Sequence, residues 1–377
     1  MPPETRYLRL QGDRIAYQVF GEGPPDLVLA PGSFGHLDIA WEDPGITLFY
    51  RTLASFCRLI VFDRRGTGVS DPLAPAPVPP WESCAQELAA VLDEVGAERA
   101  ALLAEVDAGP TGIFFAAAKP ERTSALILAH TTARFVAADD YPIGLPAEVA
   151  EALVAQIDQL WGSEALAAMV APSRAGDPRF RRWFAKLNRA GASPRAAQGF
   201  LRALLEVDVR PALPLVQAPT LVLHRPDAQL IPVEHGRYLA EHIPRATLVE
   251  LPGADPTLVW ETPELVLDHI ETFLTGVRRT AAPTRILASV LFTDIVGSTE
   301  RQASLGDRGW TTLVKQHHAA IREVLTRFRG LEQDTAGDGF YIRFDGPAQA
   351  IQCAREIVRA GPCAGDRGAG GGPHGGM

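Results

Sequence analysis

Short apolar segments alternate with amphipathic ones along the first 275 residues of the chain. Several of the apolar runs are continuous, as is typical of strands that are covered on both faces. Residues 80–97 have helical spacing and lie between two such runs. This alternation predicts a parallel β-sheet with helices on both sides. The expected strands are 26–31, 58–63, 99–105, 124–130, 220–224 and 246–252.

Further along the chain the pattern changes. Residues 136–215 are helical and rich in proline, which predicts a cap inserted into the first domain, 1–275. Residues 276–284 read as a linker, and a second domain is expected at 285–360. The tail, 361–377, is mostly glycine without periodicity and is expected to be disordered. The second domain should contain strand 285–295, helix 307–328, strands 331–338 and 339–344, and helix 347–360.

Composition narrows the functional classes. The chain has 377 residues and a net charge of −9, so no general attraction to nucleic acid or to an anionic membrane is expected. No apolar run approaches the length of a membrane span, and no signal peptide precedes the first domain. The four cysteines show neither metal spacing nor a disulfide framework. A cytoplasmic location is therefore expected.

Four stretches of the first domain resemble the α/β-hydrolase fold: LAPGSFGH (29–36), FDRRGTGVSDP (62–72), HRPDAQLIPVEHGRYLAEHIP (224–244) and ELPGADPTLVW (250–260). The resemblance implies an oxyanion loop at the first, an acid-bearing loop at the third and a histidine loop at the fourth. It spans about residues 8–275 apart from the cap. The fold class expected for this part of the chain is therefore α/β, with a helical cap.

The catalytic positions that this resemblance implies carry no reactive groups. In AEVDAGP (104–110), Val106 takes the place of the serine on the nucleophile elbow. Ala228 takes the place of the acid, four residues before Pro232, and Pro256 follows Gly-Ala-Asp where relatives have the histidine. No triad of hydroxyl, imidazole and carboxylate can form from these side chains. We expect a degenerate hydrolase domain that keeps a pocket for a small ligand under its cap.

Asp107 offers an alternative as an aspartate nucleophile of the dehalogenase and epoxide-hydrolase kind. That register would put Glu105 where the elbow needs a small residue, and the histidine that activates water would still be missing. We prefer the interpretation that Asp107 lies near a helix N-terminus and offsets its positive end.

The second domain contains residues suited to a nucleotide. Asp294 ends an apolar strand, and Gly297, Ser298 and Thr299 open a helix whose N–H groups can hold phosphates. Asp338 lies in a turn between two strands that should pair with the first. The two carboxylates would then converge on Mg²⁺ or Mn²⁺.

LFTDIVGSTE (291–300) and TAGDGF (335–340) together resemble the class III adenylyl/guanylyl cyclase catalytic domain. The resemblance implies a ferredoxin-like α+β domain, two metal ions on Asp294 and Asp338 with the Ile295 carbonyl, and a nucleotide over 296–299, which includes Val296. Asp334 takes the base-reading position, so ATP and GTP both stay open as substrates. The family acts as a dimer, so a homodimer or a dimer with a full-length cyclase is expected.

The family's domain is about twice as long, and the missing half would supply the arginine that stabilises the transition state. We therefore expect a nucleotidyl cyclase that is C-terminally truncated and impaired, with a degenerate hydrolase-like sensory domain. Two alternatives stay open: a non-catalytic pseudo-hydrolase that binds a ligand or a partner, and an active hydrolase with an unusual nucleophile.

Overall fold

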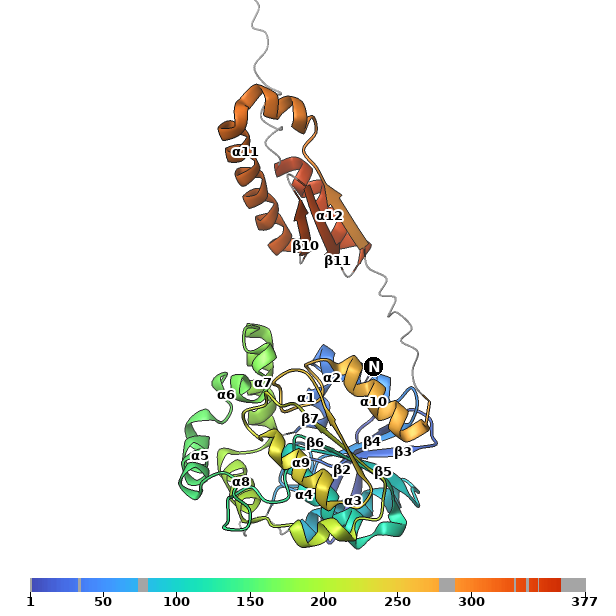
Figure 1. The fold of residues 1–377 in the computed structure, drawn as a ribbon. Helices are drawn as coiled ribbons and strands as arrows, with labels where there is room; N and C mark the ends of the chain where they lie inside the picture. The colour runs from blue at the N-terminus through green and yellow to red at the C-terminus, as the bar shows by residue number, and fades with distance from the viewer. Residues whose placement is uncertain are drawn as a thin grey trace, which may run out of the picture. The chain divides into compact units, whose positions relative to one another are not determined.

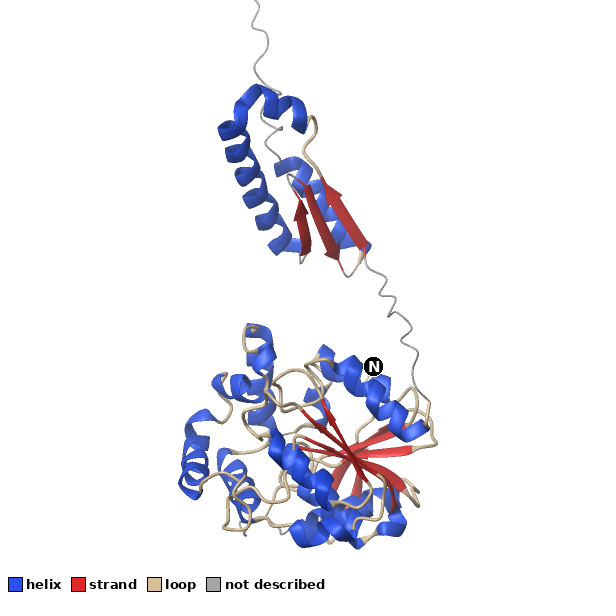
Figure 2. Ribbon diagram, in the orientation of Figure 1, coloured by secondary structure: helices blue, strands red, loops and turns tan. Residues whose placement is uncertain are grey.

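The computed structural model describes residues 2–32, 35–73, 81–277, 289–328, 330–336, 339–344 and 346–360. The chain divides into two compact units, Met1–Thr280 and Ala281–Met377, and each is described by itself. In the first unit helices surround a central sheet, and in the second a small sheet packs against helices (Figures 1 and 2).

Within its described residues, the first unit has one sheet of eight strands in the order β1-β2-β4-β3-β5-β6-β7-β8. All neighbours from β4 to β8 pair in parallel, whereas β1 pairs with β2, and β2 with β4, in antiparallel fashion. The strands are β1 (Arg6–Leu10), β2 (Asp13–Phe20), β3 (Asp26–Leu29), β4 (Arg58–Phe62), β5 (Ala100–Glu105), β6 (Thr123–Ala129), β7 (Thr220–His224) and β8 (Ala246–Glu250).

The sheet is therefore mixed, and the prediction of a purely parallel sheet is wrong at its N-terminal edge. β1 and β2 form a hairpin through Gln11 and Gly12, which both have positive φ, 54° and 100°. Two successive residues of this kind make the two-residue turn that suits the twist of a hairpin. Only one residue of β1, Leu8, is buried, so the strand lacks the continuous apolar run by which the other strands were found.

Helices cover both faces of this sheet because the strands are apolar on both sides. Leu102 in β5 faces α3 (Trp81–Glu94), α4 (Gly109–Ala118) and α9 (Val233–His242) within one buried cluster. Its neighbour Leu103 belongs to the cluster on the other face. That face is covered by α1 (Leu37–Ala40), α2 (Pro44–Leu53) and α10 (Pro263–Thr275).

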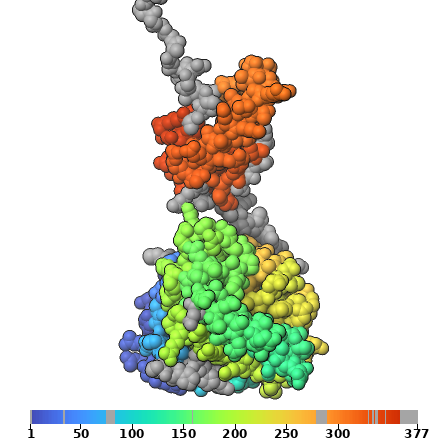
Figure 3. Space-filling model, turned by 90° about the vertical axis from the view of Figure 1, so that its left-hand side faces the viewer, coloured from blue at the N-terminus to red at the C-terminus, as the bar shows by residue number. Residues whose placement is uncertain are grey.

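A helical cap lies between β6 and β7. Its helices are α5 (Ala147–Leu160), α6 (Ala165–Val170), α7 (Pro178–Gly191) and α8 (Pro194–Glu206). Asp177 and Ser193 cap α7 and α8 by accepting backbone N–H bonds, which fixes where these helices begin. Figure 3 shows the outer surface of the cap as the green and yellow-green atoms of the first unit.

The described residues of the second unit form a three-stranded antiparallel sheet with two helices, the first of which is kinked at Gly306. Its elements are β9 (Ser289–Thr293), α11 (Ser298–Phe328), β10 (Leu331–Ala336), β11 (Gly339–Phe344) and α12 (Pro347–Ala360), and the strand order is β10-β11-β9. The helices bury one apolar cluster against the sheet, including Phe340, Ile342 and Phe344 of β11. The elements follow the expected order, but the ferredoxin-like cyclase domain expected here is not shown. Part of the expected first strand, 285–288, the linker from residue 278 and the tail from residue 361 lie outside the described residues.

The central position of β5 generates a stability prediction. Leu102 is fully buried and pairs with Val28 of β3 and Leu126 of β6. We expect Leu102→Ala to lower the free energy of unfolding by roughly 3 kcal/mol in urea, because it leaves a cavity in a packed core. Leu48→Ala, at a site that is 56% exposed, should change it by less than about 0.5 kcal/mol. Equal effects at the two sites would contradict the layering described above.

Candidate functional site

The turn from β5 into α4 has the geometry of a nucleophile elbow. Val106 follows the last residue of β5 and has a φ of 51°. A β-branched residue is rarely found in this left-handed region, and a strained strand-to-helix turn of this kind is where α/β-hydrolases expose their nucleophile. A Cβ on Gly109 would lie 1.9 Å from Thr131 Oγ1, so α4 approaches the end of β6 too closely for any larger residue. The turn is thus built as for catalysis, with an isopropyl group at its tip.

The positions expected for the acid and the histidine are equally unreactive. Ala228 is buried in the loop after β7, and its neighbour Asp227 is exposed. Pro256 is buried and lines the same cavity as Val106, from the loop after β8. The structure therefore places Val106 and Pro256 around one cavity, whereas Ala228 is not among the residues that line it.

Arg225, at the end of β7, holds the loop that carries Pro256. Its side chain is fully buried, and its guanidinium donates only to that loop. The acceptors are the carbonyl oxygens of Pro252 (3.0 Å), Asp255 (2.9 Å), Thr257 (2.9 Å) and Glu261, and Thr262 Oγ1 (3.4 Å). Where a hydrolase joins the loops after β7 and β8 by its acid–histidine pair, this chain joins them by an arginine and backbone carbonyls.

The same loop is joined to the cap. Asp255 is fully buried and accepts hydrogen bonds from the Ser173 N–H (2.9 Å) and the Ser173 hydroxyl (2.5 Å). Trp260 packs edge-on against Phe180 of α7, with ring centroids 4.9 Å apart. The cap is therefore held over the sheet by both polar and aromatic contacts.

These contacts enclose a cavity of about 240 Å³ above the elbow. Its floor includes the strand residues Leu29, Val61 and Leu103, and the cap contributes Val170, Phe184 and Leu187. The remaining side is formed by α2, with Ile46, Phe49 and Tyr50, and by the loop after β8, with Pro256, Thr257, Val259 and Trp260. A mostly apolar hollow with few polar groups is typical of a small-molecule site.

Three carboxyl groups, from Asp63, Glu105 and Asp107, also line the cavity; we call them the acidic triplet. Burial raises the pKa of Asp63 to about 7, although its Oδ2 accepts N–H bonds from Leu37 (3.2 Å) and Val69 (3.0 Å). Burial also raises the pKa of Glu105 to about 7, and the nearby charge of Asp107 adds to the effect.

Asp107 lies directly against the loop after β3. A Cβ on Gly32 would be 2.8 Å from Asp107 Oδ1, so only glycine fits there. In α/β-hydrolases this loop and the residue after the nucleophile supply the oxyanion hole. A carboxylate therefore lies beside the loop that supplies part of the oxyanion hole in active members of this fold.

The buried histidines are structural and do not line the cavity. His130 Nε2 accepts the Arg225 N–H at 3.0 Å, and His224 Nε2 lies 2.7 Å from the Ile231 carbonyl. His235 Nδ1 lies 2.9 Å from both the Thr132 and the Tyr141 hydroxyls, and burial lowers its pKa to about 4. None of the three is among the residues that line the cavity together with Val106.

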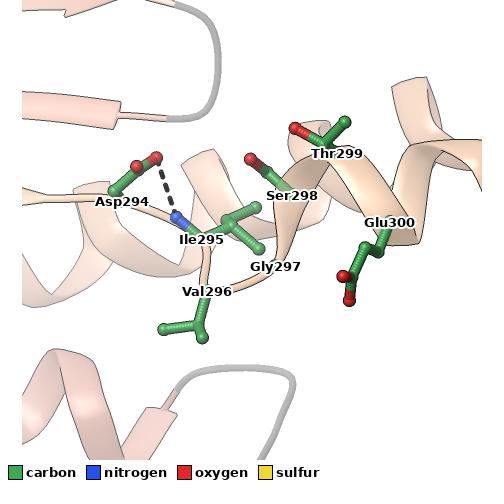
Figure 4. Close-up of a pocket in the computed structure, with 7 residues that line it drawn as sticks. All are labelled: Asp294, Ile295, Val296, Gly297, Ser298, Thr299 and Glu300. Atoms are coloured by element: carbon green, nitrogen blue, oxygen red, sulfur yellow. Dashed lines mark hydrogen bonds between the residues drawn. The ribbon is translucent and has the colours of Figure 1, made fainter.

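In the second unit, residues 294–300 form a shallow open hollow of about 440 Å³. Asp294 Oδ1 accepts the N–H of Ile295 at 3.0 Å, and the Val296 side chain points away from that of Asp294 (Figure 4). Gly297 has a φ of 70°, and Ser298 and Thr299 then begin α11. Asp338 lies outside the described residues, and nothing is described of the Asp334 side chain. The nucleotide-binding role of these residues stays a prediction, as do the expected nucleotide and the dimer partners.

The prediction that the chain binds two Mg²⁺ or Mn²⁺ ions is wrong. Within the described ranges, no three His, Cys, Asp or Glu side chains come together in a group that could hold a metal ion. Asp294 presents one carboxylate, and its Oδ1 already accepts the backbone N–H of Ile295. Hydrolases of the fold described above generally need no metal cofactor.

No helix in the described part of the chain is both long and apolar enough to cross a membrane.

The chain belongs to the α/β-hydrolase fold family, because the family model described as "alpha/beta hydrolase fold" matches residues 25–263. A pimeloyl-[acyl-carrier protein] methyl ester esterase from Chromobacterium violaceum is 30% identical over 165 residues, which are 42% of this chain and 65% of the relative. The karrikin insensitive 2 receptor IA of Petunia hybrida is 24% identical over 258 residues, 63% of this chain and 85% of the relative. A solved hydrolase from Pseudomonas aeruginosa PA01 superposes with a TM-score of 0.60 at 25% identity, covering 72% of this chain and 98% of that one.

The prediction that the chain is a class III nucleotidyl cyclase is wrong. The matching family is a hydrolase-fold family, and the relatives found with it include proteins named as hydrolases, esterases and enol-lactonases. The roles expected with it, cyclic nucleotide synthesis and signalling through a cyclase, are wrong for the same reason. The α/β-hydrolase fold of the first unit, by contrast, is confirmed.

Sequence reasoning missed Arg225, Asp255 and the acidic triplet as a group. Asp63 lies in a quoted motif, but its position in the cavity depends on the loops that cover it. Arg225 bonds to backbone carbonyls, which every residue carries, so its partners leave no signal in the sequence.

The arginine contacts give a second stability prediction. We expect Arg225→Lys to lower the free energy of unfolding by roughly 3 kcal/mol, because one ammonium cannot satisfy the buried carbonyls that the guanidinium fork serves. Arg237→Lys is the matched control, since Arg237 is half exposed and bonds to Glu250 at 2.7 Å on the surface. That change should stay below about 0.5 kcal/mol in the same urea titration. Similar values for the two variants would exclude a scaffolding role for Arg225.

Proposed function

We propose that the hydrolase-fold unit binds a small molecule in the cavity under its cap and does not hydrolyse it by a serine triad. The observation that carries this proposal is Val106, which has the strained backbone of a nucleophile and lines the cavity, yet has no group that can attack a carbonyl. Pro256 lines the same cavity and has no imidazole to act as a base. The enclosed cavity remains, and binding is what it can still perform.

The buried charge near the elbow supports the same proposal. Asp107 lies against Gly32, so an oxyanion formed beside Val106 would have a carboxylate near it. The repulsion between the two negative charges would oppose hydrolysis. One relative carries the name of a receptor, the karrikin insensitive 2 receptor IA, so a related sequence of this family bears the name of a binding protein.

Hydrolysis by a carboxyl group is the second candidate. Asp107 and Glu105 flank Val106 and line the cavity, and most of the relatives carry the names of hydrolases. An aspartate nucleophile needs a base for the water that releases the product. Among the described lining residues the only histidine is His36, whose Nδ1 accepts the Ile39 N–H at 3.4 Å at the start of α1.

Ligand binding can be tested by filling the cavity from the cap. We expect a neutral aromatic probe, 2-phenylethanol, to raise the melting temperature of the protein at millimolar concentration. Val170→Trp should abolish that shift, because Val170 lines the cavity from the end of α6. Met169→Trp adds the same indole at the adjacent, 39% exposed position and should leave the shift unchanged. A shift that survives Val170→Trp would place the probe elsewhere.

Because no catalytic triad can form, we predict that a serine at position 106 alone will not restore ester hydrolysis. We expect Val106→Ser to fold with a stability within about 1 kcal/mol of the original, because it removes β-branching at a strained position. It should hydrolyse p-nitrophenyl acetate no faster than Val106→Ala, since no base lies beside it. Saturable hydrolysis by the unchanged chain that is lost in Asp107→Asn would overturn the binding proposal and establish the second candidate.

A further inference from the structure

The cavity under the cap has an excess of acidic side chains. The acidic triplet, Asp63, Glu105 and Asp107, lines it, and no Lys or Arg side chain is found among the described residues around it. Arg225 acts on Glu105 only from outside the cavity, where it is bonded to the loop after β8. Buried carboxyl groups are normally paired or extensively hydrogen-bonded.

Two of these carboxyl groups have an oxygen without a partner. Asp63 is 4% exposed, and both of its hydrogen bonds, from Leu37 and Val69, reach Oδ2, so no donor in the described part of the chain reaches Oδ1. Glu105 accepts one N–H, from Leu258 at 3.2 Å, on Oε2. Neither Asp63 Oδ1 nor Glu105 Oε1 is among the inaccessible polar atoms that lack a partner in the described residues, and both residues line the cavity.

The rest of the cavity suits an aromatic or aliphatic body. Phe49, Phe184 and Trp260 line it together with the aliphatic side chains of the floor and the cap. Tyr50 lines it as well, and its hydroxyl is close enough to Asp63 and Glu105 for both carboxylates to raise its pKa, although burial is the larger cause. Aromatic rings beside carboxylates form a site that attracts organic cations.

We propose that the ligand of this cavity is a small primary amine with an apolar body, whose ammonium group is held by Glu105. This inference rests on the proposed function, since it names the chemical class of the molecule that the cavity binds. The ammonium donates to Glu105 Oε1, and the body of the ligand lies against the aromatic side chains. A cavity of about 240 Å³ accepts one ring with a short tail, being larger than cavities that hold benzene.

Binding should depend on pH in a definite direction. The pKa of Glu105 and that of Asp63 are both raised to about 7, so a large part of both groups is protonated at neutral pH. The groups that act on Glu105 are Asp107 from the elbow, Tyr50 from α2 and Arg225 after β7. An ammonium binds the ionised form and releases a proton, so its affinity should rise from about pH 5 to about pH 8.

The first test uses three probes of similar shape: 2-phenylethylamine, 2-phenylethanol and 3-phenylpropionate, titrated by calorimetry into the whole chain. At about pH 8 we expect the amine to bind roughly tenfold more tightly than the alcohol and the carboxylate to bind most weakly, because a charge-assisted hydrogen bond contributes about 1.5–3 kcal/mol. The heat of amine binding should vary with the ionisation enthalpy of the buffer, since a proton is released.

The second test uses Glu105→Gln, which keeps the shape of the side chain. It should weaken amine binding roughly tenfold, flatten the rise with pH and leave alcohol binding within about twofold. Glu98→Gln makes the same change of charge at an exposed site before β5 and should alter neither probe. Melting temperatures of both variants show whether they are folded.

The outcomes separate this inference from the function on which it rests. If the alcohol binds as tightly as the amine and Glu105→Gln changes neither, the cavity binds ligands but does not select a cation, and the inference is overturned. If the carboxylate binds best, it is overturned as well. If none of the three probes binds to the folded chain, the proposed function itself fails.

Discussion

The guanidinium of Arg225 is the contact on which the rest of this site depends. It is fully buried and joins the end of β7 to the loop after β8 through carbonyl oxygens of that loop. The loop then places Pro256 against the cavity, Asp255 on Ser173 of the cap, and Trp260 on Phe180. Because unpaired buried carbonyls are costly, the loop has few alternatives to this path. Arg225 therefore fixes the path of the loop that contacts both the cap and the cavity.

The elbow has the backbone geometry of a nucleophile position but carries no nucleophilic side chain. Val106 retains a φ of 51°, which is unfavourable for a β-branched residue and would be unnecessary in an ordinary turn. The close approach of Gly109 to Thr131 and the short bond from the Thr131 hydroxyl to the Val106 carbonyl impose this geometry from outside the residue. The strain is thus a property of the packing of α4 on β5 and β6.

The sequence predicts the first unit well wherever structure follows from local pattern. The buried strands, the cap and the elbow register at Val106 all follow from apolar runs and from spacing that can be read in order along the chain. The hairpin of β1 and β2 was missed because β1 buries a single residue, Leu8. Long-range features escape this kind of reasoning, since Arg225 and its acceptors are separated by 27 to 37 positions. The cyclase interpretation failed because two short motifs, which suit a turn and a helix start as well as a metal site, were given the weight of a whole domain.

The negative charges of the cavity bear on two properties: they oppose ester hydrolysis, and they favour the binding of cations. Ester hydrolysis requires that negative charge be stabilised beside the elbow, and Asp107 against Gly32 opposes this. The same negative field, with Asp63 and Glu105 added, lowers the free energy of any cation that enters the cavity. A serine at position 106 would therefore meet the wrong electrostatic environment even with a histidine beside it. The field that opposes hydrolysis is thus the feature by which the cavity would select a cationic ligand.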